Sequence, residues 1–543
     1  MVANRHKGYL CMVLHAHLPY VRHPEHTHFL EEMWLFEAMT ECYVPLLDIF
    51  SRLVEDGIDF RITLSLSPSL TEMLTDKLLM QRYADFLDRI IELTKTEIRR
   101  NKGNSLLEPV TKMYRRRLKR MNYLFTEVYG RNLISFLRML QKTGHLEIIP
   151  TTATHAYLPH LAIYPEAVKA QIRIGMQQHR DKFGCHPNGI WLPECGFASG
   201  FDQYIREEGC MFFFLDSHGI IRGAPPPPYG AHLPARCDSG VFAFGRDAEV
   251  ARQVWSSVSG YPGDAAYRDF YRDIGFDIDE DHVRAFLEPY GAKTYTGLKY
   301  YRVTGRTDRK EPYVFERARL KARQHADDFI LKTESRILNL SQRFGIRPVI
   351  TAPFDAELFG HWWFEGVDWL ESVIRGICLG RRSFRMIAPS EYLASGNGTD
   401  RVQISHPSAS SWGENGYHEV WLNQRNDYIC RHLLKATERM IELAGRFPNA
   451  EGLLRRALNQ SARELLLSQH SDWTFMIKND SSTGYAQRRL QTHIGRFNRL
   501  YESVLTGHIE EKTLSAIEAQ DAIFRNLDYR VFRRNGQELP VGG

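Results

Sequence analysis

The sequence predicts an α/β protein followed by a helical region, and three observations support this. Short apolar runs alternate with helical patterns over roughly the first 390 residues, which indicates a largely parallel sheet or barrel. Several of these runs end in His, Glu or Asp close to a proline, as expected where strand ends border one polar cavity. After a segment rich in Ser, Gly, Asn and Pro near 394–411, the pattern becomes helical.

The composition is that of a soluble globular chain, with 43% hydrophobic and 25% charged residues among 543. A net charge of +5 is too small and too scattered to indicate nucleic-acid binding. A run of about 18 apolar residues is absent, as is a signal-peptide pattern, so we expect neither a membrane span nor export. The eight cysteines form no CxxC pair and several lie in apolar runs, which favours free thiols in a reducing, cytoplasmic compartment.

The first predicted strand, 9–18, contains two histidines near its end. His15 and His17 are two residues apart, so both point to the same face of a strand. They are either hydrogen-bonded structural histidines or members of a site. As metal ligands they would need a third partner, which is not obvious nearby. A polar loop then leads to a predicted helix near 32–54.

The same arrangement is repeated further along the chain. In order, we expect a strand at 60–66, helices over 70–143, a strand at 145–150 and a helix over 165–183. The basic run at 114–120 is interpreted as a solvated helix face. His155 follows the strand at 145–150 and precedes a proline, which makes it a third histidine just past a strand.

Glu194 lies in the stretch around which the chain is organised, 189–197. An apolar run leads into Pro193, which ends a strand because proline cannot donate to a ladder, and Glu194, Cys195 and Gly196 follow. A carboxylate at the carboxyl end of a strand is where α/β barrels place catalytic groups. The alternative is a surface glutamate in a strand-to-helix turn.

The middle of the chain is rich in loops. Four consecutive prolines at 225–228 exclude helix and central strand, so 222–240 is expected to be a stiff extended loop with Tyr229 at or near its tip. It is either a surface loop or a lid that contacts substrate. Around it we expect a strand at 211–215, a turn at 260–264 and mainly helical structure over 265–345.

A second carboxylate follows the predicted strand at 347–352. Asp355 and Glu357 are two residues apart, so spacing alone does not say which one faces a site. Trp362 and Trp363 come next and either cap a sugar or pack internally. A last strand is expected at 384–388.

The remaining residues are expected to form a separate helical domain. Its predicted helices are 428–445, 452–469, 484–506 and about 510–526. Trp412 and Trp421 precede them, and Asp472 lies between two of them. These side chains either border the active site or pack between domains.

Two carboxylates, three histidines and many aromatics at strand ends suit glycoside chemistry. One carboxylate attacks the anomeric carbon or activates water while the other protonates the leaving oxygen, and the two lie about 5–5.5 Å apart in a retaining enzyme. Histidines and acids hydrogen-bond hydroxyls, and Trp or Tyr stack on sugar rings. Motifs for phosphoryl and hydride transfer are absent from the sequence.

Several ordered motifs give a more specific resemblance. They are His15-Ala16-His17-Leu18-Pro19-Tyr20, the stretches 145–149 and 154–159, Trp191-Leu192-Pro193-Glu194-Cys195, the run 352–363, the segment from Trp412 to Trp421, and 468–473. On these motifs, nearly the whole chain resembles glycoside hydrolase family 57, and within it the 1,4-α-glucan branching enzymes.

The resemblance implies a (β/α)₇ barrel with an inserted helical region and an all-α C-terminal domain. We expect the catalytic barrel at 1–395, with a helical insertion at about 70–143, a loop and helical excursion at about 216–275, and the C-terminal domain at 405–535. Glu194 matches the nucleophile and Asp355 the general acid/base. The implied substrate-binding residues are His15, His17, His155, Tyr229, Trp363, Trp412, Trp421 and Asp472.

The implied reaction is cleavage of an internal α-1,4 linkage and transfer of the chain to a 6-hydroxyl. Its partner is an α-glucan such as amylose or glycogen, and neither a metal nor an organic cofactor is implied; oligomeric state is not predicted. Three alternatives remain: an α-amylase or 4-α-glucanotransferase on the same scaffold, a metal-dependent polysaccharide deacetylase that uses His15 and His17, and a non-catalytic glycan-binding protein.

Overall fold

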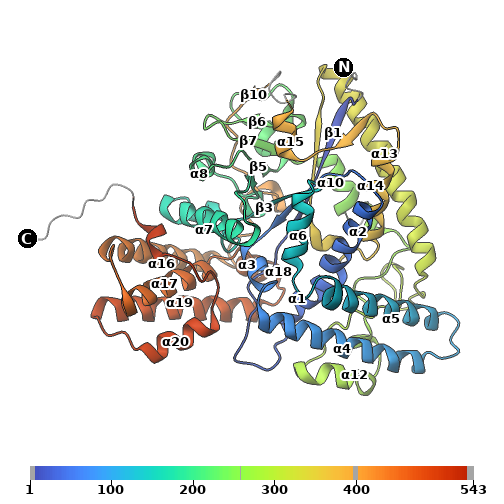
Figure 1. Cartoon of the computed structure of the whole chain (residues 1–543), viewed down its shortest axis with the longest axis horizontal. Coiled ribbons are helices and arrows are strands. Elements are labelled where there is room, and N and C mark those ends of the chain that lie inside the picture. Colours follow the sequence, from blue (N-terminus) through green and yellow to red (C-terminus); the bar gives the residue numbers. More distant parts are fainter. Residues whose placement is uncertain (1–5, 257–258, 396–401, 535–543) are drawn as a thin grey trace, which may run out of the picture.

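A computed structural model describes residues 6–256, 259–395 and 402–534 (Figure 1). Residues 396–401, inside the boundary segment predicted near 394–411, lie outside the described residues, as do both ends of the chain. The protein combines parallel strands, helices that surround them, and a C-terminal group of helices. The predicted α/β class with a largely helical C-terminal region is confirmed.

Two five-stranded sheets carry the strand ends that build the site. One has the order β3-β2-β1-β8, with β9 also paired to β1, and the other has the order β10-β6-β7-β5-β4. The strands are β1 Gly8–Ala16, β2 Ile62–Leu66, β3 Leu146–Pro150, β4 Gly189–Ile190, β5 Phe212–Leu215, β6 Ala235–Arg236, β7 Phe242–Gly245, β8 Val349–Asp355, β9 Phe384–Met386 and β10 Gln403–Ile404. Among these strands every pairing is parallel except that of β6 with β7.

The two sheets contact each other at both of their borders. Next to β4, the Trp191 N–H donates to Pro150 O of β3 at 2.9 Å. After β7, Arg246 forms a parallel bridge with Thr351 of β8, and the Asp247 N–H donates to Thr351 O at 2.8 Å. Strands β1, β2 and β5 are buried along their whole length. The sequences of β1 and β5 are nearly continuous apolar runs, as expected when both faces of a parallel sheet are covered, whereas β2 also buries Thr63 and Ser65.

Helices surround the strands. The longer ones coincide with segments whose sequence has a helical period. They are α1 Glu32–Ala38, α2 Val44–Glu55, α3 Pro68–Met73, α4 Lys77–Arg100, α5 Leu107–Tyr123, α6 Leu133–Lys142, α7 Pro165–Phe183, α8 Phe201–Glu207, α9 Ser217–Ile221, α10 Ala248–Trp255, α11 Ile274–Asp277, α12 Glu280–Leu287, α13 Phe315–Phe344, α14 Gly366–Cys378 and α15 Pro389–Ala394. The helix predicted over 165–183 is confirmed, with Pro165 at its start and Gly184 in the left-handed region at its end.

The C-terminal helices lie together on one side of the molecule, opposite α13 and α14 (Figure 1). They are α16 Asp427–Arg446, α17 Gly452–Ser468, α18 Ser471–Asn479, α19 Thr483–Thr506 and α20 Glu511–Gln520. In the described part of the chain, none of the helices has the length and apolar character needed to cross a membrane.

The structure adds to or corrects the sequence-based expectations in three places. The segment 265–345, expected to be mainly helical, contains α11, α12 and the long α13. Between these helices its path is irregular and is held by buried polar contacts such as those of Asp273 with Gly275 and Thr296. Strand β7 was not predicted, since its four residues are too few to show a period and are ordered by pairing with β5. Asp472 lies in the first turn of α18 rather than in a loop.

Candidate active site

A cavity of about 540 Å³ lies at the carboxyl ends of the strands. Strand ends form one side and the segment leading into the C-terminal helices forms the other. The cavity brings together every predicted site residue except Tyr229 and Trp363. Those that line it are His15, His17, His155, Glu194, Asp355, Trp412, Trp421 and Asp472.

Glu194 is held by the backbone and by two hydrogen bonds to its carboxylate. It follows β4 in a short 3-10 turn, with a φ of 61° that is unfavourable for a residue with a side chain. Trp412 Nε1–H donates to Oε2 at 2.8 Å, and Ser471 Oγ–H donates to Oε1 at 3.0 Å. Burial raises the pKa of Glu194, while the Trp412 hydrogen bond stabilises the charged form.

Asp355 ends β8 directly beside His15 of β1. Burial, and then the neighbouring carboxylates Glu357 and Glu194, raise the pKa of Asp355 well above its ordinary value, and Arg246 only partly opposes them. Asp355 therefore retains its proton to a higher pH than an exposed aspartate. Two carboxyl groups in such different environments are suited to different roles, one as a base or nucleophile and one as an acid.

Glu357 also lines the cavity but is engaged by protein groups. Its Oε1 accepts from the Tyr43 hydroxyl and from the His17 backbone N–H, the latter at 3.3 Å. Burial raises the pKa of Glu357 to about 7. Tyr43 belongs to a single π-helical turn, Met39–Tyr43, and such turns are frequent at functional sites. The two-residue spacing therefore places both carboxyls in the cavity and leaves Asp355 the freer one.

The three histidines form one connected group. His15 Nε2 and His155 Nε2 lie 3.0 Å apart, and the rings of His17 and His155 stack with centroids 3.7 Å apart. His17 Nε2 lies 2.9 Å from Asp472 Oδ2, which joins β1 to α18. Burial lowers the pKa of His15 and of His155 well below the ordinary value, so both are neutral near pH 7. They therefore interact as neutral hydrogen-bonding groups, not as ions.

Two clusters have the residue types of a metal site. In the cavity, ligand atoms of His17, His155 and Asp472 lie within 4.8 Å of one another. Their nitrogens are directed at protein partners, however: those of His17 at Ser67 and Asp472, and those of His155 at His15 and Ser471. This arrangement favours a hydrogen-bonding role over metal ligation.

The second cluster, Glu464, His493 and Asp521, is buried among the C-terminal helices. Arg496 and Arg489 both pair with Asp521. These cations supply the positive charge that the two carboxylates need, so the cluster is balanced by protein groups.

Two predicted residues lie away from the cavity. Tyr229 is half-buried, with its ring edge-on to Phe344 at 6.0 Å, and its N–H donates to Gln403. Trp363 is 1% exposed and packs against Trp369, because the turn after β8 directs it inward. The neighbouring Trp362 lines the cavity instead.

Sequence reasoning missed several residues of the cavity. Two are exposed aromatic side chains on its wall, Trp255 at 52% exposure and Phe475 at 44%. Trp362, for which the sequence left sugar contact and internal packing open, also lies there and is 53% exposed. Arg246, which lies over the Trp412 ring, was missed because it follows the unpredicted strand β7. Ser471 lies within the motif at 468–473, but nothing in the sequence marks it as a partner of Glu194.

Comparison with known proteins identifies the relatives of this chain. Residues 11–405 match the model of glycosyl hydrolase family 57, and 432–532 match that of the 1,4-α-glucan branching enzyme C-terminal region. A 1,4-α-glucan branching enzyme of Thermococcus kodakarensis is 33% identical over 96% of this chain and 78% of its own.

Two solved structures are similar over their full length. The α-amylase AmyC of Thermotoga maritima is 42% identical, with a TM-score of 0.90 over 97% of this chain and 99% of its own. A family 57 branching enzyme of Pyrococcus horikoshii is 31% identical, with a TM-score of 0.87 over 98% of both chains. The relatives thus include both a hydrolase and chain-transferring enzymes.

Proposed function

The chain belongs to glycoside hydrolase family 57, and we propose that it is a 1,4-α-glucan branching enzyme with Glu194 as nucleophile and Asp355 as general acid/base. These roles are assigned because the two carboxyl groups lie in contrasting environments. Glu194 accepts hydrogen bonds from Trp412 and Ser471 that favour its charged form, whereas burial and like charges keep the proton on Asp355. Relatives with branching activity extend over nearly the whole chain.

We propose that seven strands, β1-β2-β3-β4-β5-β7-β8, close into a (β/α)₇ barrel. The contacts of β3 with β4 and of β7 with β8 support closure, since they join the two sheets at both borders. The domain division at about 395–405 agrees with the end of the family model at 405. Segments 70–143 and 216–275 then interrupt the barrel, although the second of them contributes β7.

The first half-reaction follows from this geometry. Glu194 attacks the anomeric carbon of an internal α-1,4-linked glucose, and Asp355 gives its proton to the departing oxygen, which yields a glycosyl-enzyme. The Asp472 carboxylate, held by His17 through Oδ2, keeps a further oxygen that accepts from hydroxyls of the bound ring, and the uncharged His15 and His155 hold this arrangement in place.

In the second half-reaction, a 6-hydroxyl of another glucan attacks the glycosyl-enzyme while Asp355 accepts its proton. Transfer exceeds hydrolysis only where water is kept from the intermediate. Aromatic side chains suit this task because they hold a glucan chain against the cavity mouth. Trp255, Trp362 and Phe475 have the required exposure there, whereas Tyr229 would have to move from its contact with Phe344 to take part.

The fitting biological role is glycogen synthesis in the cytoplasm. A polymer with α-1,6 branches is the product of the proposed reaction. All eight cysteines are free, five of them buried, as in a chain that works in a reducing compartment.

An α-amylase is the second candidate, because the hydrolase AmyC is 42% identical to this chain. Both activities share the first half-reaction, so the products separate them. Incubation with amylose, followed by isoamylase debranching, should give falling iodine staining, little new reducing sugar, and short chains released only after debranching. Rising reducing ends without new branches would identify an amylase.

Replacement of Glu194 by Gln tests the nucleophile. The variant should lose turnover while its circular dichroism matches that of the parent and its unfolding midpoint does not fall, because the amide keeps the shape but cannot attack. Glu127→Gln, an exposed glutamate outside the cavity, is the matched control and should branch normally. Near-normal branching by Glu194→Gln would show that another group is the nucleophile.

A further inference from the structure

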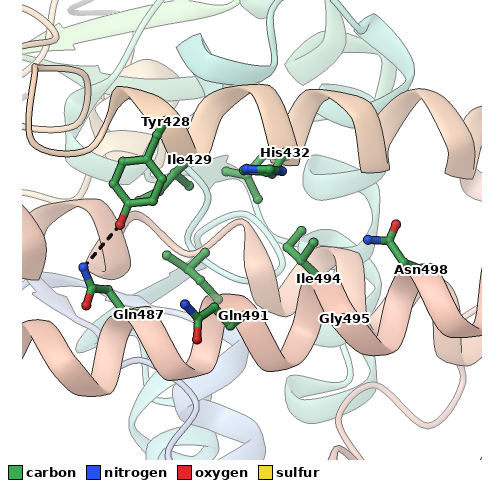
Figure 2. A pocket seen from close by; sticks show the side chains of 10 residues that line it. Tyr428, Ile429, His432, Gln487, Gln491, Ile494, Gly495 and Asn498 are labelled. Atoms are coloured by element: carbon green, nitrogen blue, oxygen red, sulfur yellow. Dashed lines mark hydrogen bonds between the residues drawn. The ribbon is translucent and has the colours of Figure 1, made fainter.

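A second cavity lies outside the active site, in a groove between α16 and α19. It has a volume of about 620 Å³. Its walls are two helix faces that oppose each other, as Figure 2 shows for the side chains of Tyr428, Gln487 and Gln491. The lining residues are Tyr428, Ile429, His432, Leu433, Gln487, Leu490, Gln491, Ile494, Gly495 and Asn498.

The spacing of residues along α16 and α19 explains how this groove forms. Gln487, Gln491 and Gly495 follow one another at four-residue intervals along α19, so they lie in one row. Tyr428 and His432 have the same spacing on α16. From Gln487 to Asn498 the row extends on the order of 16 Å at 1.5 Å per residue.

The chemistry of the groove matches a neutral, hydroxyl-rich ligand. Its ten lining residues include no Lys, Arg, Asp or Glu. Buried aliphatic groups such as Leu490 form the floor, and an aromatic ring, Tyr428, stands 39% exposed at one end. Amides line the rest: within the described chain Gln491 has no hydrogen-bond partner, and Asn498 accepts from Arg439 through Oδ1, which leaves its NH₂ free to donate.

Gly495 keeps the groove open. A glycine inside a helix is less stable than alanine by about 1 kcal/mol, so its presence in the middle of α19 calls for a reason. Close packing is not that reason, since a Cβ built at Gly495 would meet no atom within 4 Å. A larger side chain here would instead project into the open space of the groove.

We propose that this groove is an accessory binding site for a linear segment of α-glucan, separate from the active-site cavity. The proposal rests on the proposed function, because an enzyme whose substrate is a long neutral polymer gains effective concentration by holding it at a second point. A flat sugar face stacks on Tyr428, and the amides of Gln487, Gln491 and Asn498 bond its hydroxyls.

Two variants test the site without disturbing the catalytic residues. Gly495→Leu fills the groove and should keep or raise the unfolding midpoint, because leucine favours helix more than glycine. Tyr428→Ala removes the stacking face. Tyr123→Ala, which removes another exposed tyrosine at the end of α5, is the control; Tyr123 is 57% exposed and Tyr428 39%.

Each change is placed in the Glu194→Gln background, and mobility is measured in native gels that contain glycogen. Either groove variant should weaken glycogen retardation by about fivefold, as expected for loss of one good contact. Tyr123→Ala should leave retardation unchanged. With Glu194 restored, both groove variants should turn over maltoheptaose at the parental kcat and show a raised KM only for long amylose.

The outcomes separate the two proposals. Parental retardation of both groove variants would overturn the accessory site while the amylose assay still reports branching. Absence of any α-glucan turnover by the parent would overturn the proposed function itself. A change from dimer to monomer in Gly495→Leu, measured by light scattering, would show that a second copy of the chain occupies the groove and would also overturn the proposal.

Discussion

The hydrogen bond from Trp412 to Glu194 should set the acid limb of the pH–rate profile. In Trp412→Phe the ring remains but the Nε1–H that lies 2.8 Å from Glu194 Oε2 is lost. Burial raises the pKa of Glu194, and the bond from Trp412 opposes that rise because it favours the ionised carboxylate. Loss of the bond should therefore raise the pKa of Glu194 further. Because only ionised Glu194 attacks, activity is then lost at a higher pH than in the parent.

The magnitude follows from the charge of the acceptor. A hydrogen bond to a charged group contributes about 1.5–3 kcal/mol, and one pKa unit corresponds to about 1.4 kcal/mol. Since Ser471 still donates to Oε1, we take the lower end and expect the acid limb to move upward by about one pH unit. The basic limb, which reports Asp355, should stay in place.

The assay is kcat/KM for branching across pH, which reports the ionisations of the free enzyme. Trp421→Phe is the matched control, because Trp421 also lines the cavity but its buried Nε1 has no partner among the described residues. An acid limb that stays in place in Trp412→Phe, or that moves equally in Trp421→Phe, would refute the reasoning. A uniform fall in rate at every pH would mean that Trp412 acts on substrate alone.

Three further predictions concern stability and metals. Asp355→Asn should raise the unfolding midpoint at about pH 8 but not at about pH 3. Burial raises the pKa of Asp355 in the folded protein, so its carboxyl lowers the stability of the parent as pH rises above the unfolded-state pKa of about 4. Equal shifts in scanning fluorimetry at both pH values would contradict this. Asp472→Asn should lower stability by about 1–3 kcal/mol near neutral pH. Burial alone would raise the pKa of Asp472, but His17 holds it well below the ordinary value, so the contribution is present above about pH 4 and is lost as pH falls; a variant as stable as the parent at pH 7 would disprove the role of the pair. Dialysis against EDTA should leave glucan turnover unchanged, because the nitrogens of His17 and His155 already face protein partners; activity lost and then restored by a divalent cation would instead favour a metal enzyme.

The strand ends could be predicted from sequence because local rules determine them. The alternation of His15 and His17 places both on one face. Pro193 correctly marks the turn that carries Glu194, although β4 already ends at Ile190. The predicted strands at 9–18, 60–66 and 145–150 are confirmed with shifts of up to two residues at their ends. Assignments of this kind depend only on neighbours in the chain.

The choice between adjacent residues could not be predicted, since tertiary contacts decide it. Trp362 and Trp363 are chemically alike, and only the turn after β8 sends one to the cavity and the other inward. The position of Tyr229 depends on Gln403, which is far away in sequence. Asp355 and Glu357 differ in role because Tyr43 engages one of them.

The C-terminal segment is part of the proposed catalytic centre, and backbone strain supports this. His155 and Glu194 both have a positive φ, 54° and 61°, which costs a residue with a side chain roughly 1–2 kcal/mol. Such conformations persist only where surrounding contacts hold them.

Here the holding contacts come from beyond the family 57 catalytic strands. The Trp412 N–H donates to the Glu194 carbonyl at 2.9 Å and the Ser471 N–H to the His155 carbonyl at 3.1 Å, while the Ser471 hydroxyl contacts both side chains. Without residues 410–472, the strand ends would therefore lose the groups that hold Glu194 in place and stabilise its charge. Glu194 can accordingly be in position only when the C-terminal helices are folded against the strand ends, which would couple the proposed catalysis to the region that would also bind the polymer.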